Sequence, residues 1–456
     1  MKLWLALLVA GAVGLLVLAR LPMPLLEPEE GRYAEIPRQM LVAGEIVVPV
    51  LGGEPYLDKP PLSYWLNMAA YRVFGISEWS ARIVPCLAAL AIVAVTLVWG
   101  SSIAGPRTGL CSAGVLLTCP DFLYRAPMLT PNGLLTLFVA AGWAAGHIAQ
   151  QPRRSKWLWW SLSAIATALG VLTKGPVAAV FVWVPLWAYC FWRREKQQVR
   201  GNLLQIAIVL LVAAPWFIAV TTRHPEFLEY FFWKHHVERA ITPFDHAQPL
   251  WYYVPRLLVG AAPWTVMVLI GLLRGRRPTS DAIFPLMVMA WAFFFLSLSG
   301  SKRPIYLLPV YPALAVAIGT SSRTESISIP AFLRGLEAIA ACVALWLPGY
   351  HAEFSFRGLL QPIPVQIKKE WPIACYPHDW PSVGFQLQRS DLATFSRGQE
   401  AELASFLRQN EKTLVVLKAG ATAKEFAAIL PRDMKWNQCG DNQAAVIGTV
   451  TKKTKK

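Results

Sequence analysis

The sequence predicts a polytopic α-helical membrane protein with interfacial helices in its first outer loop and a small α/β domain at its C-terminal end. Of its 456 residues, 55% are hydrophobic and only 15% are charged. The apolar residues gather in long runs, which a soluble protein of this length does not need. Twenty tryptophans fit the same class, because indole rings prefer the headgroup boundary of a bilayer.

Roughly eleven apolar segments are candidate membrane helices by their length. The first resembles the core of a signal peptide, but no clear small-residue cleavage site precedes Leu21, so we interpret it as a span. The segments lie near residues 3–19, 81–99, 108–124, 133–149, 157–172, 176–192, 203–220, 252–273, 281–298, 304–320 and 331–348.

The basic residues predict the orientation of these spans. Three basic loops, within residues 150–156, 193–200 and 274–277, fall on the same side, which the positive-inside rule makes cytoplasmic. The loops of residues 20–80 and 221–251 and the C-terminal tail are then extracytoplasmic, and the plasma (inner) membrane is the expected location. Because the net charge of +16 is spread over short loops, anionic lipids and phosphates are favoured as partners and nucleic acid is not.

The composition becomes polar after Pro348, which predicts a membrane domain of residues 1–348 and an extracytoplasmic domain of residues 349–456. Short β-like runs alternate there with helical patterns, as in a small α/β domain. Cys375 and Cys439 flank β-like runs in this domain. An oxidising compartment would permit a disulfide between them, and two free thiols are the alternative.

The charged first outer loop, Glu27–Pro61, is the candidate catalytic loop. Apolar residues at helical spacing from Glu29 to Met40 predict a short interfacial helix with its charged face in water. Two prolines follow Asp58 and Lys59 and fix the chain direction, so that the lysine can be aimed at a phosphate. The alternative interpretation is a solvated charged surface beside the membrane.

Two motifs of this loop resemble the GT-C membrane glycosyltransferases that use polyprenyl-phosphate sugars, and most of all the aminoarabinose lipid A transferases. Glu29–Glu35, EEGRYAE, matches an acidic pair before x-Arg-Tyr-Ala-Glu. Asp58–Pro61, DKPP, matches an acid-Lys-Pro-Pro motif. The resemblance extends to about residue 320. It implies a GT-C fold and transfer of a sugar from a lipid phosphate.

Such a transfer needs a base or stabilising carboxylate near the acceptor. We assign this role to Glu29, which stands where the family usually has aspartate, with Glu30 and Glu35 as alternatives. Asn132 closes the second outer loop at a position where the family commonly has aspartate. An asparagine there cannot ionise, but it can orient an acceptor through hydrogen bonds.

The departing phosphate needs cations, and further motifs of the outer loops resemble the family. Lys174 lies in Leu-Thr-Lys-Gly-Pro, His236 and Arg239 form His-x-x-Arg, and Ser299–Tyr306 matches Ser-x-Ser-Lys-x-Pro-x-Tyr. For Lys174, the alternative is a side chain that merely reaches the interface. We assign the donor phosphate to Lys59, Arg239, Lys174, Lys302 and Arg303, and substrate contacts to Arg32, Tyr33, Glu35 and Tyr306.

No cofactor is required by these motifs, although His235 or His236 with Asp58 could bind a divalent metal. An interfacial histidine with a structural role is the alternative. The predicted function is transfer of a sugar from a polyprenyl-phosphate donor to a lipid or glycan acceptor outside the membrane. The rival functions are transfer to protein hydroxyls, as in the protein mannosyltransferases, and a transporter or lipid-binding scaffold without enzymatic activity.

Overall fold

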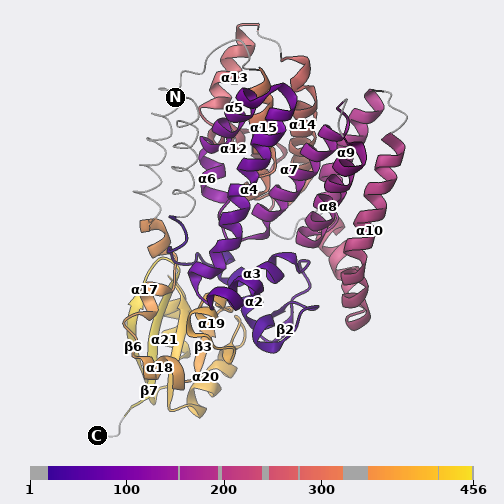
Figure 1. Ribbon diagram of the computed structural model, residues 1–456. Coiled ribbons are helices and arrows are strands. Elements are labelled where there is room, and N and C mark those ends of the chain that lie inside the picture. The colour runs from indigo at the N-terminus through magenta and orange to yellow at the C-terminus, as the bar shows by residue number, and fades with distance from the viewer. Residues whose placement is uncertain are drawn as a thin grey trace. The chain divides into compact units, whose positions relative to one another are not determined.

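The computed structural model describes residues 19–151, 155–193, 198–238, 246–275, 278–321, 348–419 and 421–453 (Figure 1). The chain divides into two compact units. The first contains Met1–Leu21, Leu57–Leu66 and Arg82–Val343, and the second contains Pro22–Tyr56, Asn67–Ala81 and Ala344–Lys456. The contacts therefore group two segments from the region of the first outer loop with the C-terminal part of the chain, a grouping that the sequence analysis did not predict.

The described parts of the first unit are mainly helical. Four helices there are long and apolar enough to cross a membrane, and the bent pair Leu250–Gly260 and Trp264–Leu273 would add a fifth if it forms one span. The predicted spans 3–19 and 331–348 lie almost wholly outside the described residues, so the total of eleven stays a prediction. The helices are α4 (Glu78–Ala104), α5 (Pro106–Leu117), α6 (Pro120–Arg125), α7 (Pro131–Ala149), α8 (Lys156–Lys174), α9 (Val177–Trp192), α10 (Gln198–Arg223), η1 (Glu229–Glu238), η2 (Leu250–Tyr252), α12 (Tyr253–Gly260), α13 (Trp264–Leu273), η3 (Ser280–Ala282), α14 (Ile283–Leu298), η4 (Pro304–Leu307) and α15 (Val310–Ser321).

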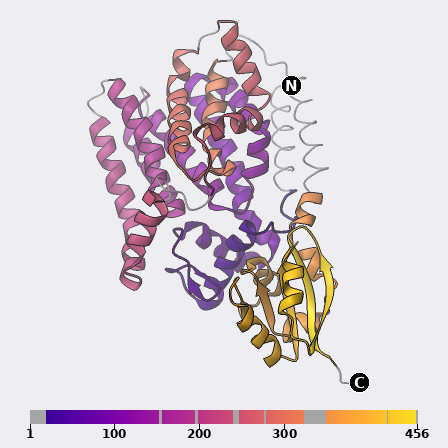
Figure 2. The same ribbon diagram turned by 180° about the vertical axis from the view of Figure 1, so that it is seen from behind.

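Small and hydroxyl-bearing residues allow α7, α8 and α9 to pack closely side by side (Figures 1 and 2). A Cβ atom on Gly146 of α7 would lie only 2.6 Å from the Leu186 side chain of α9. Ser163 of α8 donates a hydrogen bond to the Gly142 carbonyl of α7, and Gln205 of α10 donates to Ser163. In an apolar surrounding such partners are needed, because a buried polar group without one is costly.

The second unit contains a five-stranded sheet of order β4-β3-β5-β7-β6. Strand β3 pairs in parallel with β4 and β5, whereas β7 pairs antiparallel with β5 and β6. Apolar clusters pack on both faces, as the pattern of an α/β domain predicts. The strands are β3 (Ile373–Tyr376), β4 (Leu392–Thr394), β5 (Lys412–Lys418), β6 (Met434–Asp441) and β7 (Ala445–Lys452), and the helices are α17 (Arg357–Leu360), α18 (Val365–Glu370), α19 (Pro381–Leu387), α20 (Glu400–Gln409) and α21 (Ala421–Ile429).

The predicted helix of the first outer loop is α2 (Glu29–Ala43), and it belongs to the second unit. It packs against α19, and its charged face is buried there instead of facing water. Arg38 of α2 donates to the Arg389 carbonyl and to the Ser390 hydroxyl. The hairpin β1 (Val50–Leu51) and β2 (Glu54–Pro55) follows, and helix α3 (Leu62–Phe74) comes next.

Of the two alternatives for Cys375 and Cys439, the structure shows two free thiols and no disulfide between them. Both thiols are free, and Cys375 lies in β3 while Cys439 lies in β6. Strands β5 and β7 separate them in the sheet, so at about 4.8 Å per strand the two cysteines are roughly 14 Å apart. A disulfide needs a Cα separation of about 4.4 to 6.8 Å.

We therefore expect a thiol reagent to modify Cys439, which is exposed, without prior reduction of the protein. The buried Cys375 should react only after denaturation. Peptide mass spectrometry of the labelled, folded protein measures both, with Cys439→Ser as the control that removes the early label. Labelling of Cys439 only after reduction would show that the two strands had been placed wrongly.

Candidate functional site

Three residues that the sequence analysis selected from separate motifs lie together in the first unit. The Nζ atom of Lys174 donates a hydrogen bond of 2.6 Å to the Oδ1 atom of Asn132. The same Nζ atom lies 4.2 Å from the centre of the Tyr306 ring, a cation–π distance. The cluster of Lys174, Asn132 and Tyr306 is thus a positive charge held by two neutral groups.

The ends of two helices place the cluster. Lys174 is the last residue of α8, and Gly175 follows with φ of 90°. Residues with a side chain rarely adopt this backbone conformation, and the glycine allows the chain to turn into α9. Asn132 lies in the first turn of α7, after the N-cap residue Thr130 and Pro131. The Nδ2 atom of Asn132 donates to the Thr130 hydroxyl, which directs the acceptor Oδ1 at the lysine.

An asparagine at this position changes the electrostatics of the lysine. A carboxylate would form an ion pair with Lys174 and cancel most of its charge, whereas the amide oxygen only orients the ammonium group. The hydrogen bond to Asn132 therefore directs the Lys174 ammonium group without adding a negative charge beside it.

The Asp58–Lys59 turn also lies in the first unit, where it is tied to helix η1. Tyr230 of η1 donates a hydrogen bond of 2.8 Å to the Asp58 carboxylate. Burial and the Asp58 charge raise the pKa of Tyr230 to about 12, so its hydroxyl stays a neutral donor. Lys59 donates to the carbonyl of Asp58. Tyr230 was missed in the sequence because a tyrosine beside other aromatic residues gave no signal of its own.

The Lys302 ammonium group is mainly occupied by the backbone. It donates to the carbonyls of Gln248 and Ser299, and the side chain is 3% exposed. Burial lowers the pKa of Lys302. The neighbouring Arg303 carbonyl accepts from Tyr253. Lys302 thus holds two loop segments together, and its predicted contact with the donor phosphate stays a prediction, as does that of Arg303.

The predicted metal site is only partly within the described residues. Asp58 is described, but Arg239 and the side chains of His235 and His236 are not. Among the described residues no group of three or more histidine, cysteine or acidic side chains is placed to hold a metal ion. The metal and the phosphate contact of Arg239 remain predictions.

The candidate carboxylates lie in the second unit, on α2. Glu30 is fully buried and accepts a hydrogen bond of 2.9 Å from the Leu26 backbone. Glu35 accepts from Arg38 and Gln39; burial raises its pKa although the arginine opposes that change. Glu29 is half-buried in the first turn of the helix. Of the three, Glu29 alone is partly accessible.

Arg32 and Tyr33, the predicted substrate contacts on the same helix, are half-buried. Arg32 forms a hydrogen bond with Tyr56, which also belongs to the second unit. The predicted site therefore divides between the two units: the cations and Asn132 in the first, the carboxylates with Arg32 and Tyr33 in the second.

Several known proteins are similar to this chain. The family model of the dolichyl-phosphate-mannose-protein mannosyltransferases matches residues 25–231. An undecaprenyl phosphate-alpha-4-amino-4-deoxy-L-arabinose arabinosyl transferase of Erwinia tasmaniensis is 33% identical over 64% of the chain, and one of Aeromonas salmonicida is 31% identical over 71%. The crystal structure of ArnT from Cupriavidus metallidurans bound to undecaprenyl phosphate superposes with a TM-score of 0.81 at 22% identity, covering 98% of each chain.

In sequence the chain is similar to the aminoarabinose transferases. It has the GT-C fold and is an integral membrane protein, as predicted. The chain spans 54% and 61% of the lengths of the Erwinia and Aeromonas relatives.

One acid that the sequence analysis left without a role has an unusual environment in this GT-C chain. The carboxyl group of Glu27 is buried in the second unit, where Oε1 accepts from the Ser382 backbone. Burial raises the pKa of Glu27 to about 7, more than the Ser382 hydrogen bonds lower it. The signal was absent from the sequence because Ser382 lies 355 residues away.

This pKa predicts how the stability of the second unit depends on pH. The folded state holds the Glu27 proton more tightly than the unfolded state, whose pKa is near 4.5, so the free energy of unfolding should fall as pH rises from about 4.5 to 7 and then level off. Glu27→Gln should flatten this interval. Chemical unfolding at several pH values measures it, with the exposed Glu402→Gln as control. An unchanged slope in Glu27→Gln would contradict the assignment.

Proposed function

We propose that the protein transfers a sugar from a polyprenyl-phosphate carrier to a lipid or glycan acceptor at the extracytoplasmic face of the plasma (inner) membrane. The cluster of Lys174, Asn132 and Tyr306 carries this proposal. It supplies an ammonium group that an amide oxygen and an aromatic ring orient, and an oriented cation of this kind stabilises a departing phosphate. The names of the relatives make 4-amino-4-deoxy-L-arabinose on undecaprenyl phosphate the first donor to test.

In this mechanism, Lys174 binds the phosphate of the donor and offsets the charge that grows on it as the sugar leaves. Lys59, in the turn anchored by Tyr230, is the second candidate cation. Arg239 is the third. Glu29 accepts the proton of the acceptor, because Glu30 and Glu35 are buried and hydrogen-bonded within their own unit.

The rival functions predict different features. A transporter places functional charges near the middle of its spans, whereas Lys174 and Asn132 lie at helix ends. Transfer to protein hydroxyls would use the same donor cluster and differ only in the acceptor. The match of residues 25–231 to the protein mannosyltransferases keeps that acceptor as the second candidate.

The donor cluster can be tested by two substitutions. Lys174→Gln removes the charge, and Asn132→Leu removes the amide oxygen that orients it. Both should lower turnover about a hundredfold or more and reduce the amount of polyprenyl phosphate that copurifies with the protein. Radiolabelled sugar transfer and lipid mass spectrometry measure the two effects. Lys156→Gln, at the opposite end of α8, is the matched control.

Normal turnover in both cluster variants would exclude Lys174 from the donor site. Full retention of polyprenyl phosphate without any transfer to lipid, glycan or protein acceptors would favour the non-enzymatic alternative.

The base can be tested in the same assay. Glu29→Gln keeps the shape of the side chain and removes its basicity, so we expect turnover to fall by about two orders of magnitude. Glu30→Gln should mainly weaken the start of α2 and lower the melting temperature. If Glu30→Gln instead loses turnover at unchanged stability while Glu29→Gln remains active, the base is Glu30.

A further inference from the structure

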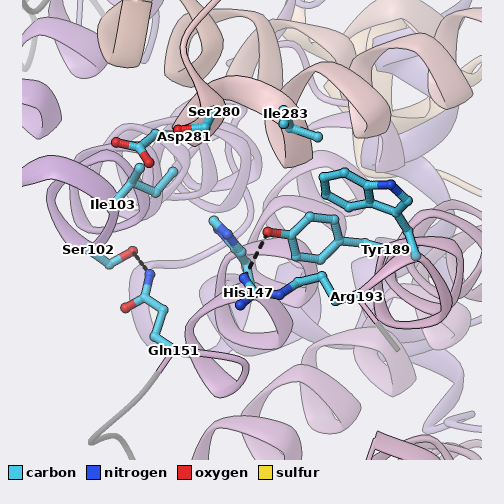
Figure 3. Close-up of a pocket in the computed structure, with 10 residues that line it drawn as sticks. Ser102, Ile103, His147, Gln151, Tyr189, Arg193, Ser280, Asp281 and Ile283 are labelled. Carbon is cyan, nitrogen blue, oxygen red and sulfur yellow. Dashed lines mark hydrogen bonds between the residues drawn. The ribbon is translucent and has the colours of Figure 1, made fainter. Parts of the chain in front are cut away.

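A polar cavity with a volume of about 850 Å³ lies in the first unit. Figure 3 shows residues that line it. It opens between the C-terminal ends of α4, α7 and α9 and the start of α14. Its lining combines hydroxyl, amide, imidazole, aromatic and oppositely charged side chains: Ser102, Ile103, His147, Gln151, Tyr189, Trp192, Arg193, Ser280, Asp281 and Ile283.

This cavity is separate from the donor cluster. Helix α7 carries Asn132 in its first turn and His147 in its last, fifteen residues further along. At 1.5 Å per residue the two lie about 22 Å apart along the helix axis. Helix α9 agrees with this placement, because it begins just after Lys174 and ends at Trp192, which lines the cavity. The start of α14 lines the same cavity. The cavity therefore faces the opposite membrane surface, which the basic loops predict to be cytoplasmic.

His147 is a buried polar side chain in the wall of this cavity. It is 7% exposed, and its Nδ1 atom accepts a hydrogen bond of 3.1 Å from the Trp99 indole. A neutral imidazole that accepts at Nδ1 carries its proton at Nε2, so the second nitrogen is a donor. Phe284 packs at 4.6 Å and Tyr189 at 5.8 Å from the ring centre and hold its orientation.

The two charges of the cavity lie on different walls. Arg193 follows α9, lies over the Tyr189 ring at 5.8 Å and donates to the Tyr189 hydroxyl at 3.3 Å. Asp281 lies in η3, just before α14, and Figure 3 draws it across the cavity from Arg193. A guanidinium group suits a phosphate, whereas a carboxylate suits an ammonium group.

The surroundings match a lipid more than a soluble molecule. Trp192 lines the cavity and is 58% exposed, and the adjacent Phe191 is 86% exposed. Exposed aromatic residues at the end of a membrane helix lie at the headgroup level, where acyl chains and polar groups meet. A ligand here can keep its chains in the bilayer while its headgroup enters the cavity.

We propose that this cavity binds the headgroup of an ethanolamine phospholipid, with its phosphate at Arg193 and its ammonium group at Asp281. The His147 Nε2 proton, the Gln151 amide and the Ser102 and Ser280 hydroxyls supply hydrogen bonds to the same headgroup. The bound lipid connects the ends of four helices on the side away from the donor cluster. This inference does not depend on the proposed transferase activity.

Native mass spectrometry of the full chain in detergent tests the site. Dioleoyl phosphatidylethanolamine should remain bound at collision energies that strip dioleoyl phosphatidylcholine, because the methylated choline nitrogen has no proton to donate. Arg193→Gln should weaken retention of both lipids about tenfold. Asp281→Asn should remove the preference for ethanolamine while leaving the choline lipid unchanged. Arg200→Gln, in the first turn of α10 and absent from the lining, is the matched control.

Equal retention of the two lipids by the wild-type chain, or an equal loss in Arg193→Gln and Arg200→Gln, would overturn the proposal. Displacement of the lipid by millimolar inorganic phosphate, dependent on Arg193, would assign the cavity to a soluble anion instead. Each variant is first checked by size-exclusion chromatography. If Arg193→Gln does not fold, the loss of ethanolamine preference in Asp281→Asn decides the question alone.

Discussion

The hydrogen bond from Lys174 to Asn132 fixes the direction of a positive charge by means of a neutral group. Tyr306 adds a neutral face to the same ammonium group. The Asp58 turn uses the same device with the opposite sign, since the neutral hydroxyl of Tyr230 holds a carboxylate. In both places a neutral group orients a charged one. Lys174 and Asn132 lie at helix ends, and charges in the middle of an apolar bundle cost far more.

In the second unit, two opposite charges are paired with one another instead. Glu35 and Arg38 neutralise one another in a buried pair with bonds of 2.6 Å, and Arg38 also reaches the backbone of the segment after α19. Such a pair contributes little net stability once its desolvation is counted, but removing one partner would leave a buried charge. Its effect is to fix how α2 lies against α19. The buried side of α2 is thus held rigidly, while Glu29 stays near the solvent.

The sequence predicted the parts that depend on local chemistry. Long apolar runs predicted the membrane helices, and the separate motifs around Asn132, Lys174 and Tyr306 predicted three residues that the structure joins. What it could not predict depends on distant partners. The charged face of α2 was expected in water because the sequence near residue 38 does not indicate a partner beyond residue 380. The order of the strands could not be predicted for the same reason. The β-like runs at Cys375 and Cys439 indicate strands, but they do not indicate that β5 and β7 lie between these strands.

The burial of Arg38 against Arg389 also has a consequence for the time course of synthesis. The two residues are 351 positions apart, so the first outer loop is made long before the surface that holds it. At about 5 to 20 residues per second, the ribosome needs roughly 20 to 70 s to close that interval. During this time α2 has no α19 to cover its buried acids and arginine. The acidic helix of the first loop reaches its final state only when the last hundred or so residues have been synthesised.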